Sequence, residues 1–157
     1  MKIILDSSAV IAFLSELDNP KLLCELNKLG YILLIPNSVF REIEKGKTFS
    51  KLQKSIQNKV IALLDKNDSR EIQKLKYRYP SLHDGEIEVI LEGIKLNKSN
   101  DDYFCVIDET PARKIANQFN IKIVYTIKLL DILEKKGIIK DKTELVRKLK
   151  EAGFYVK

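Results

Sequence analysis

Four acidic residues occupy positions from which a parallel α/β sheet would bring their side chains together. Asp6 and Asp108 each end a short apolar run, the pattern of a strand buried on both faces of a parallel sheet. Glu42 and Glu86 stand near the starts of two predicted helices. Because the carboxyl ends of parallel strands and the helices that follow them meet at one edge of the sheet, we expect all four carboxylates to share that edge.

A cluster of this kind would need a counter-charge. Two carboxylates about 5 Å apart repel by roughly 3 kcal/mol at an effective dielectric constant near 20, and protons or metal ions must offset several such pairs. His83 is the only histidine, and Cys24 and Cys105 lie far apart in the sequence. The ligands would therefore be oxygens, which suit Mg²⁺ or Mn²⁺ better than Zn²⁺. Such ions activate water and stabilise the charge that develops when a phosphodiester is hydrolysed.

Ordinary structural roles compete with this interpretation. Asp6 and Asp108 could each cap the helix that follows, but their shared edge favours a joint function. Glu42 has the weaker case, because a glutamate early in a helix is common for the helix dipole alone. Receiver domains and Asp-x-Asp phosphatases also gather acids at strand ends, but Ser7 and Ser8 stand where these classes need a further acid.

The helix predicted from Asp84 onward contains several more acids. Glu86 borders the buried stripe of this helix, whereas Glu88 and Glu92 are expected to point away from it. Asp84 is expected to cap the helix, although it could instead hold a metal-bound water. Glu86 is therefore the candidate ligand of this segment.

Apolar runs alternate with amphipathic segments along the whole chain. Strands are predicted at 3–5, 31–35, 103–107 and 121–125. Helices are predicted at 9–17 with a serine cap, between Pro20 and Gly30, around 37–43, and at 69–79, 84–94, 110–119 and 126–136, with a last helix after 141. The region 46–68 allows two interpretations, because 56–64 fits a helical face while 60–64 also fits a strand. The βα alternation predicts an α/β fold, a three-layer α/β/α sandwich with a central parallel sheet.

Length and composition agree with one globular domain over 1–157. The 157 residues are 45% hydrophobic and 32% charged, enough apolar side chain for a real core. The formal charge of +6 makes an anionic partner such as nucleic acid plausible, although lysine-rich helices alone would give the same excess. No apolar run approaches the length of a membrane span and no leader cleavage site follows the N-terminus, so we expect a cytoplasmic protein.

The order and spacing of five segments resemble the PilT N-terminus (PIN) domain nucleases, in the archaeal and bacterial branch whose third motif is glycine-glutamate. The matching segments are LDSSAVIAFL at 5–14, IPNSVFREI at 35–43, LHDGEIEVILEG at 82–93, VIDETPARKIA at 106–116 and TIKLLDILEKKGII at 126–139. The resemblance implies that the metal-binding and catalytic acids are Asp6, Glu42, Glu86 and Asp108. It also implies that Ser8 supplies a hydroxyl beside the first acid.

Further residues of these segments have candidate supporting roles. Glu109 assists Asp108 or faces solvent, and Arg113 contacts a phosphate or pairs with a nearby acid. Thr126 is expected to cap the last matching helix. Where many relatives carry glycines around this turn, the chain has Tyr125 and Lys128, which leaves the shape of the site beside Thr126 open and makes Lys128 a candidate RNA contact.

The resemblance implies a Mg²⁺- or Mn²⁺-dependent endoribonuclease, the toxin of a VapBC-type toxin–antitoxin pair. It further implies a homodimer and a small antitoxin protein as partner. The alternative is a PIN-like domain that binds RNA or a partner protein without cutting RNA.

Overall fold

Five strands pair in parallel to form one sheet within residues 1–154, the part of the chain that this computed structural model describes. The last three residues of the predicted domain, 155–157, lie outside the described residues. The sheet order is β3-β2-β1-β4-β5. The strands are β1 (Lys2–Leu5), β2 (Ile32–Ile35), β3 (Ile61–Leu63), β4 (Tyr103–Val106) and β5 (Ile123–Val124). Because β1 lies between β2 and β4, the expected adjacency of the strands before Asp6 and Asp108 is confirmed.

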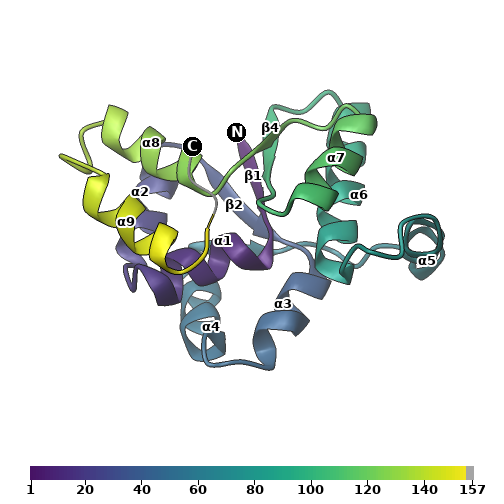
Figure 1. Ribbon diagram of the computed structural model, residues 1–157, viewed down its shortest axis with the longest axis horizontal. Helices are drawn as coiled ribbons and strands as arrows, with labels where there is room; N and C mark the ends of the chain where they lie inside the picture. The colour runs from purple at the N-terminus through teal and green to yellow at the C-terminus, as the bar shows by residue number, and fades with distance from the viewer. Residues whose placement is uncertain (155–157) are drawn as a thin grey trace.

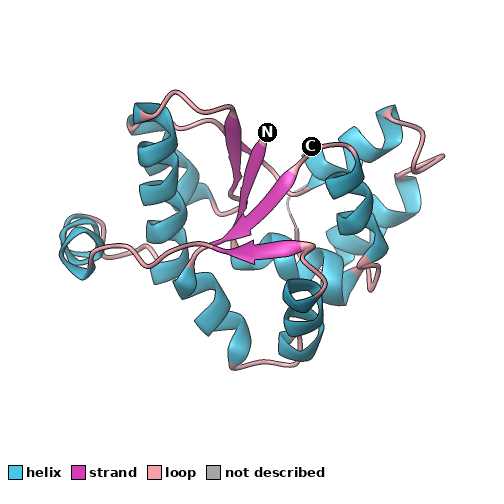
Figure 2. Ribbon diagram, turned by 180° about the vertical axis from the view of Figure 1, so that it is seen from behind, coloured by secondary structure: helices cyan, strands magenta, loops and turns pink. Residues whose placement is uncertain are grey.

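Helices cover both faces of this sheet, as Figures 1 and 2 show. One group contains α6 and α7, which pack on each other beside β4 and β5, and a second contains α2, α8 and α9. The helices are α1 (Ser7–Ile11), its π-helical continuation η1 (Ala12–Glu16), α2 (Lys21–Lys28), α3 (Asn37–Glu44), α4 (Phe49–Gln57), α5 (Ser69–Arg78), α6 (Asp84–Lys98), α7 (Thr110–Gln118), α8 (Ile127–Lys135) and α9 (Thr143–Glu151). The predicted α/β/α sandwich is therefore confirmed. Within residues 1–154, every helix is too short or too polar to cross a membrane.

The first helix differs from the prediction at both ends. Asp6, rather than either serine, is the N-cap, and its Oδ1 accepts a hydrogen bond from the Ala9 amide at 2.9 Å. The helix then widens, and the Leu17 amide donates to the Ala12 carbonyl at 2.8 Å, the five-residue spacing of a π-turn. The capping explanation of Asp6 is thus correct for one of its two oxygens.

The ambiguous region contains both a helix and a strand. α4 ends at Gln57, Lys59 has a positive φ of 60°, and β3 then pairs with β2 at the edge of the sheet. The continuous helical face across 56–64 is therefore wrong, and the strand alternative is confirmed. A left-handed residue between the two elements turns the chain where a helix would have to continue.

The prediction that Glu88 and Glu92 point away from the buried stripe of α6 is wrong. Both side chains are buried, and Glu88 is only 1% exposed. α6 is enclosed because it packs against α3, α5, α7, β1 and β4, so residues 85–93 have no solvent face. The Glu88 carboxylate accepts hydrogen bonds from the amide and hydroxyl of Ser38 and from the side-chain amide of Asn67. These bonds satisfy its charge and tie α6 to the start of α3.

Candidate active site

A pocket of about 260 Å³ lies at the carboxyl edge of the central strands. It brings together three of the four predicted acids. Asp6 follows β1, Glu42 lies on α3, and Glu86 is in the first turn of α6. The remaining lining residues are Ser7, Ser8, His83 and Glu109. Three separate segments of the chain thus place carboxylates around one cavity.

Asp6 is the most buried acid of the pocket, with 3% of its surface exposed. Burial raises its pKa well above the ordinary value of 3.8, and the negative charges of Asp108 and Glu86 raise it further. The hydrogen bond from Ala9 acts in the opposite direction and is too weak to restore the ordinary value. Asp6 therefore holds its charge at a cost that a nearby cation would offset.

Glu86 is held by the backbone of its own helix. Its Oε1 accepts a hydrogen bond from the His83 amide at 2.9 Å, which fixes the carboxylate over the first turn of α6. Burial raises the pKa of Glu86, and the charges of Glu109 and Glu42 also raise it. The side chain thus combines a capping role with membership of an acidic group.

Glu42 reaches the pocket because α3 and α6 approach each other closely. A Cβ on Gly85 would lie 3.0 Å from Glu42 Oε2 and 3.2 Å from Val39 Cγ2. Both distances are shorter than usual contacts of a Cβ atom, so a larger residue at position 85 would force Glu42 or Val39 to shift. Gly85 therefore has a packing role beside Glu86 in the same motif.

Asp108 is on the same edge but faces an adjoining pocket of about 360 Å³ with Ser8 and Glu109. Its Oδ1 accepts from the Thr126 amide at 2.9 Å, and its Oδ2 from the Thr126 hydroxyl at 2.5 Å. Burial raises the pKa of Asp108 although both bonds lower it. Asp108 does not cap α7, whose N-cap position is Glu109. The expected capping bond of Thr126 is also not formed, because its hydroxyl binds Asp108 instead.

Arg113 packs against the backbone and an aromatic ring. Its guanidinium donates to the Ile107 carbonyl at 2.6 Å and lies 3.5 Å from the centre of the Tyr125 ring. Among residues 1–154 no carboxylate lies within ion-pair distance of it, so of the two expected roles the salt bridge is not formed. Its charge nevertheless lowers the pKa of Asp108. Tyr125, the departure from the family pattern, is the ring on which this arginine rests.

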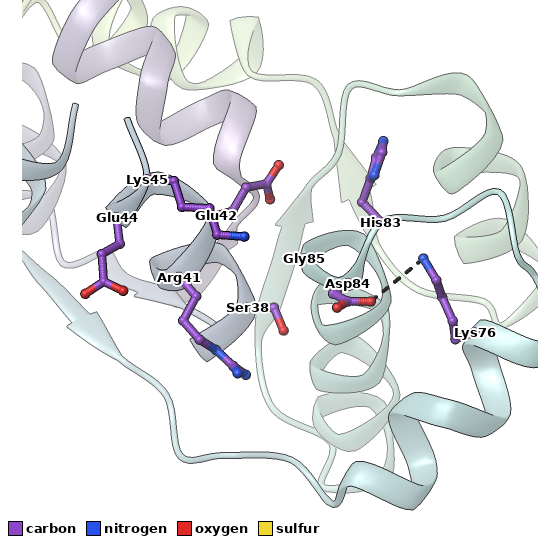
Figure 3. Close-up of a pocket in the computed structure, with 9 residues that line it drawn as sticks. All are labelled: Ser38, Arg41, Glu42, Glu44, Lys45, Lys76, His83, Asp84 and Gly85. Atoms are coloured by element: carbon purple, nitrogen blue, oxygen red, sulfur yellow. Dashed lines mark ion pairs between the residues drawn. The ribbon is translucent and has the colours of Figure 1, made fainter. Parts of the chain in front are cut away.

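Asp84 is not the cap of α6, because the N-cap position is His83. Asp84 is the first helical residue, and its carboxylate pairs with Lys76 at 3.8 Å, as Figure 3 shows. It lines a larger pocket of about 450 Å³, which contains Glu42 but not Asp6, Glu86 or Asp108. His83, which was not among the candidate site residues, lines both this pocket and the acidic one. Its place directly before the Asp-Gly-Glu motif is the signal that could have identified it.

The three pockets form one depression across the sheet edge. The large pocket shares Glu42 and His83 with the acidic pocket, which in turn shares Ser8 and Glu109 with the pocket of Asp108. The large pocket is lined by the cations Arg41, Lys45 and Lys76 and by the acids Glu42, Glu44 and Asp84. The centre of the depression is therefore acidic, and the large pocket carries charges of both signs.

The donor set suits a hard cation. All four acids offer oxygen ligands, which Mg²⁺ and Mn²⁺ prefer, and none of them has an ion-pair partner within the described residues. Over the same part of the chain, no three His, Cys, Asp or Glu side chains stand close enough to hold one ion. The chemistry of the site fits a divalent metal, whereas its side chains are more widely spaced than a finished coordination shell.

One comparison with known proteins identifies the chain. A family model described as "DUF3368: PIN domain" matches residues 2–157. No curated protein matches the sequence.

Proposed function

This chain belongs to the PIN domain family, a family of nuclease-type fold, and we propose that it is an endoribonuclease that hydrolyses RNA phosphodiester bonds with Mg²⁺ or Mn²⁺. The observation that carries the proposal is the convergence of Asp6, Glu42 and Glu86 on one pocket without a neutralising cation. Buried carboxylates with raised pKa values need a positive partner at neutral pH.

The backbone prepares two of these acids for binding. Asp6 and Glu86 each accept a backbone amide through one carboxylate oxygen, which orients the group. Asp108 is oriented through both of its oxygens, which accept the amide and the hydroxyl of Thr126. When bound, the divalent ion would neutralise these acids, activate a water and polarise the phosphate.

The rest of the depression suits an anionic chain. Arg41, Lys45 and Lys76 lie where phosphates on one side of the scissile bond would pass. The net charge of +6 would attract RNA over longer distances.

The test is cleavage of a labelled single-stranded RNA in Mn²⁺, in Mg²⁺ and in EDTA. We expect cleavage only with a divalent ion, and a loss of at least about a hundredfold in Asp6→Asn, because the amide keeps the bond to Ala9 but removes the charge. Glu25→Gln on α2, in an exposed ion pair, is the matched control. A folded Asp6→Asn protein with full activity would refute the assignment.

The second candidate is a PIN-like domain that binds RNA or a partner protein without cutting RNA. The wide spacing of the acids favours it, since no three of the described side chains stand ready for one ion. RNA binding without cleavage at any Mn²⁺ concentration would select this alternative.

We further propose that the protein is the toxin of a VapBC-type pair, acts as a homodimer in the cytoplasm and is inhibited by a small antitoxin. The sequence resemblance supports the toxin role, and two free thiols, Cys24 and Cys105, agree with a reducing compartment. The test is growth arrest on expression, with rescue by the product of the neighbouring gene. The mass of the purified protein in solution tests the dimer.

A further inference from the structure

α5 is the most peripheral helix of the structure, as both views in Figures 1 and 2 show. It contains no fully buried residue, it packs on α6, and Ile72 and Leu75 are its two half-buried side chains against the core. The rest of its surface faces solvent. A helix held by one narrow stripe has most of its circumference available for a partner.

The solvent face of α5 is basic and carries an aromatic ring. Arg70, Lys74 and Tyr77 follow one another at helical spacing i, i+4 and i+7, so they lie along one side. Tyr77 is 91% exposed, the most exposed large hydrophobic residue within the described part of the chain. Counting Lys76 and Arg78 with them, α5 has four cations against the single acid Glu71, a net charge of +3.

α5 adjoins the candidate active site through Lys76, which lies about 100° around the helix from Tyr77 and so on the flank of this face. Lys76 of α5 lines the large pocket with Arg41 and Lys45, and that pocket meets the acidic one at Glu42 and His83. Figure 3 shows Lys76 on α5 pointing to the start of α6. A ligand that passes the carboxylates and leaves the depression at this end therefore reaches α5.

We propose that α5 binds the single-stranded RNA substrate beside the cleavage site, with Arg70 and Lys74 on phosphates and Tyr77 stacked on an unpaired base. The inference rests on the proposed function for the identity of the ligand. An exposed ring can stack only on a base whose face is open, which selects single strands over duplexes. An acidic peptide would also match the cations, but its acidic side chains offer no flat ring on which Tyr77 could stack.

The test measures RNA affinity in EDTA, where cleavage cannot interfere, by fluorescence anisotropy of a labelled 12-nucleotide single strand and of its duplex. Tyr77→Ala should weaken single-strand binding about tenfold, and Tyr77→Phe should restore it, because the ring alone stacks. Arg70→Ala with Lys74→Ala should lower the dependence of log affinity on log salt by about 1.4, the value for two lost contacts to single-strand phosphates. Lys21→Ala with Lys28→Ala on α2 is the matched control.

A second readout separates binding from chemistry. In Mn²⁺, Tyr77→Ala should raise KM for the 12-nucleotide RNA at unchanged kcat, and should leave cleavage of a dinucleotide unaffected. The substituted side chains of α5 are exposed, so the melting temperature of each α5 variant should match that of the wild type.

The outcomes distinguish this inference from the nuclease proposal. Unchanged RNA affinity in both α5 variants would overturn the inference even if the protein cuts RNA. Binding that depends on α5 without cleavage would support it and reject the nuclease. A duplex preference would overturn the single-strand assignment. α5-dependent binding of a polyglutamate peptide with no effect on RNA would overturn it in favour of a protein partner.

Discussion

Gly85 and Glu42 touch across the crossing of α3 and α6, since a Cβ at position 85 would stand 3.0 Å from Glu42 Oε2. The absence of a side chain at Gly85 lets the first turn of α6 approach α3. Glu42 and Glu86 enter the same pocket because of this approach. The glycine of the Gly-Glu pair thus lies where the helices that carry two acids of the candidate site approach each other.

Gly85→Ala should lower RNA cleavage about tenfold with little change in stability. The new methyl group displaces the Glu42 carboxylate, while the helix preference of alanine, up to about 1 kcal/mol, offsets crowding against Val39. The measurement is cleavage rate and melting temperature, repeated in a Glu42→Ala background. There, Gly85→Ala should have little further effect on cleavage, and additive losses would refute the coupling.

Glu86→Gln and Asp84→Asn should differ sharply. Glutamine can still accept the His83 amide, so Glu86→Gln should fold but lose metal-dependent cleavage. Asp84 forms an exposed ion pair with Lys76 and caps nothing, so Asp84→Asn should cost less than about 1 kcal/mol and keep activity. Parallel cleavage assays and melting curves decide, and the reverse pattern would make Asp84 the third acid.

Asp108→Asn should stabilise the protein in EDTA and lose that advantage in Mn²⁺. The substitution removes one of the repelling charges and keeps side-chain size and an oxygen for the Thr126 amide. The melting temperature should rise by about 2–4 °C for each 1 kcal/mol of repulsion removed. In millimolar Mn²⁺ the difference in melting temperature between Asp108→Asn and the wild type should narrow or change sign, because the ion stabilises only the intact site. An equal shift with and without metal would mean that the acids do not act as one cluster.

The metal-free protein should lose stability as pH rises above the ordinary carboxyl range. Asp6, Glu86 and Asp108 all have raised pKa values, chiefly because they are buried, so the folded state holds their protons more tightly than the unfolded chain does. Their contribution to stability is complete below the unfolded pKa values, near 4, and is lost as pH rises through the folded values. In EDTA, the free energy of unfolding of Asp6→Asn should therefore increase relative to that of the wild type as pH rises above about 4.

A control of opposite sign is available at Asp141. Hydrogen bonds from Thr143 lower the pKa of Asp141, so its contribution is present above the ordinary pKa and is lost as pH falls. The stability of Asp141→Asn relative to that of the wild type should decrease as pH rises. A gap between Asp6→Asn and wild type that does not change with pH would contradict the raised pKa of Asp6.

The edge shared by Asp6 and Asp108 was predictable because it depends on topology alone. Parallel strands have all their carboxyl ends on one side, so an acid after each strand needs no further information to be placed there. The family membership followed in the same way from the order of the motifs. The pairing of Asp108 with Thr126 was not predicted, because a threonine before a helix normally caps that helix.

Burial and strand pairing that depend on segments far apart in the sequence were predicted least well. Glu88 lies on the polar side of the α6 pattern and has no local reason to be buried. Its partners Ser38 and Asn67 lie 50 and 21 residues away in sequence, and only the assembled fold brings them to it. The strand at 61–63 likewise depends on pairing with β2, which periodicity within one segment does not report.

The central position of β1 in the sheet also affects when its two edges can pair during protein synthesis. One of its neighbours, β2, leaves the ribosome soon after it, but the other is β4, at residues 103–106, about a hundred residues later. A growing chain therefore exposes one edge of its first strand until residues 103–106 have been made, and pairing over such a separation is slow. Asp108 and Glu109 emerge only after β4. If the pocket cuts RNA, a nascent or prematurely terminated polypeptide that ends before residue 108 lacks a complete site.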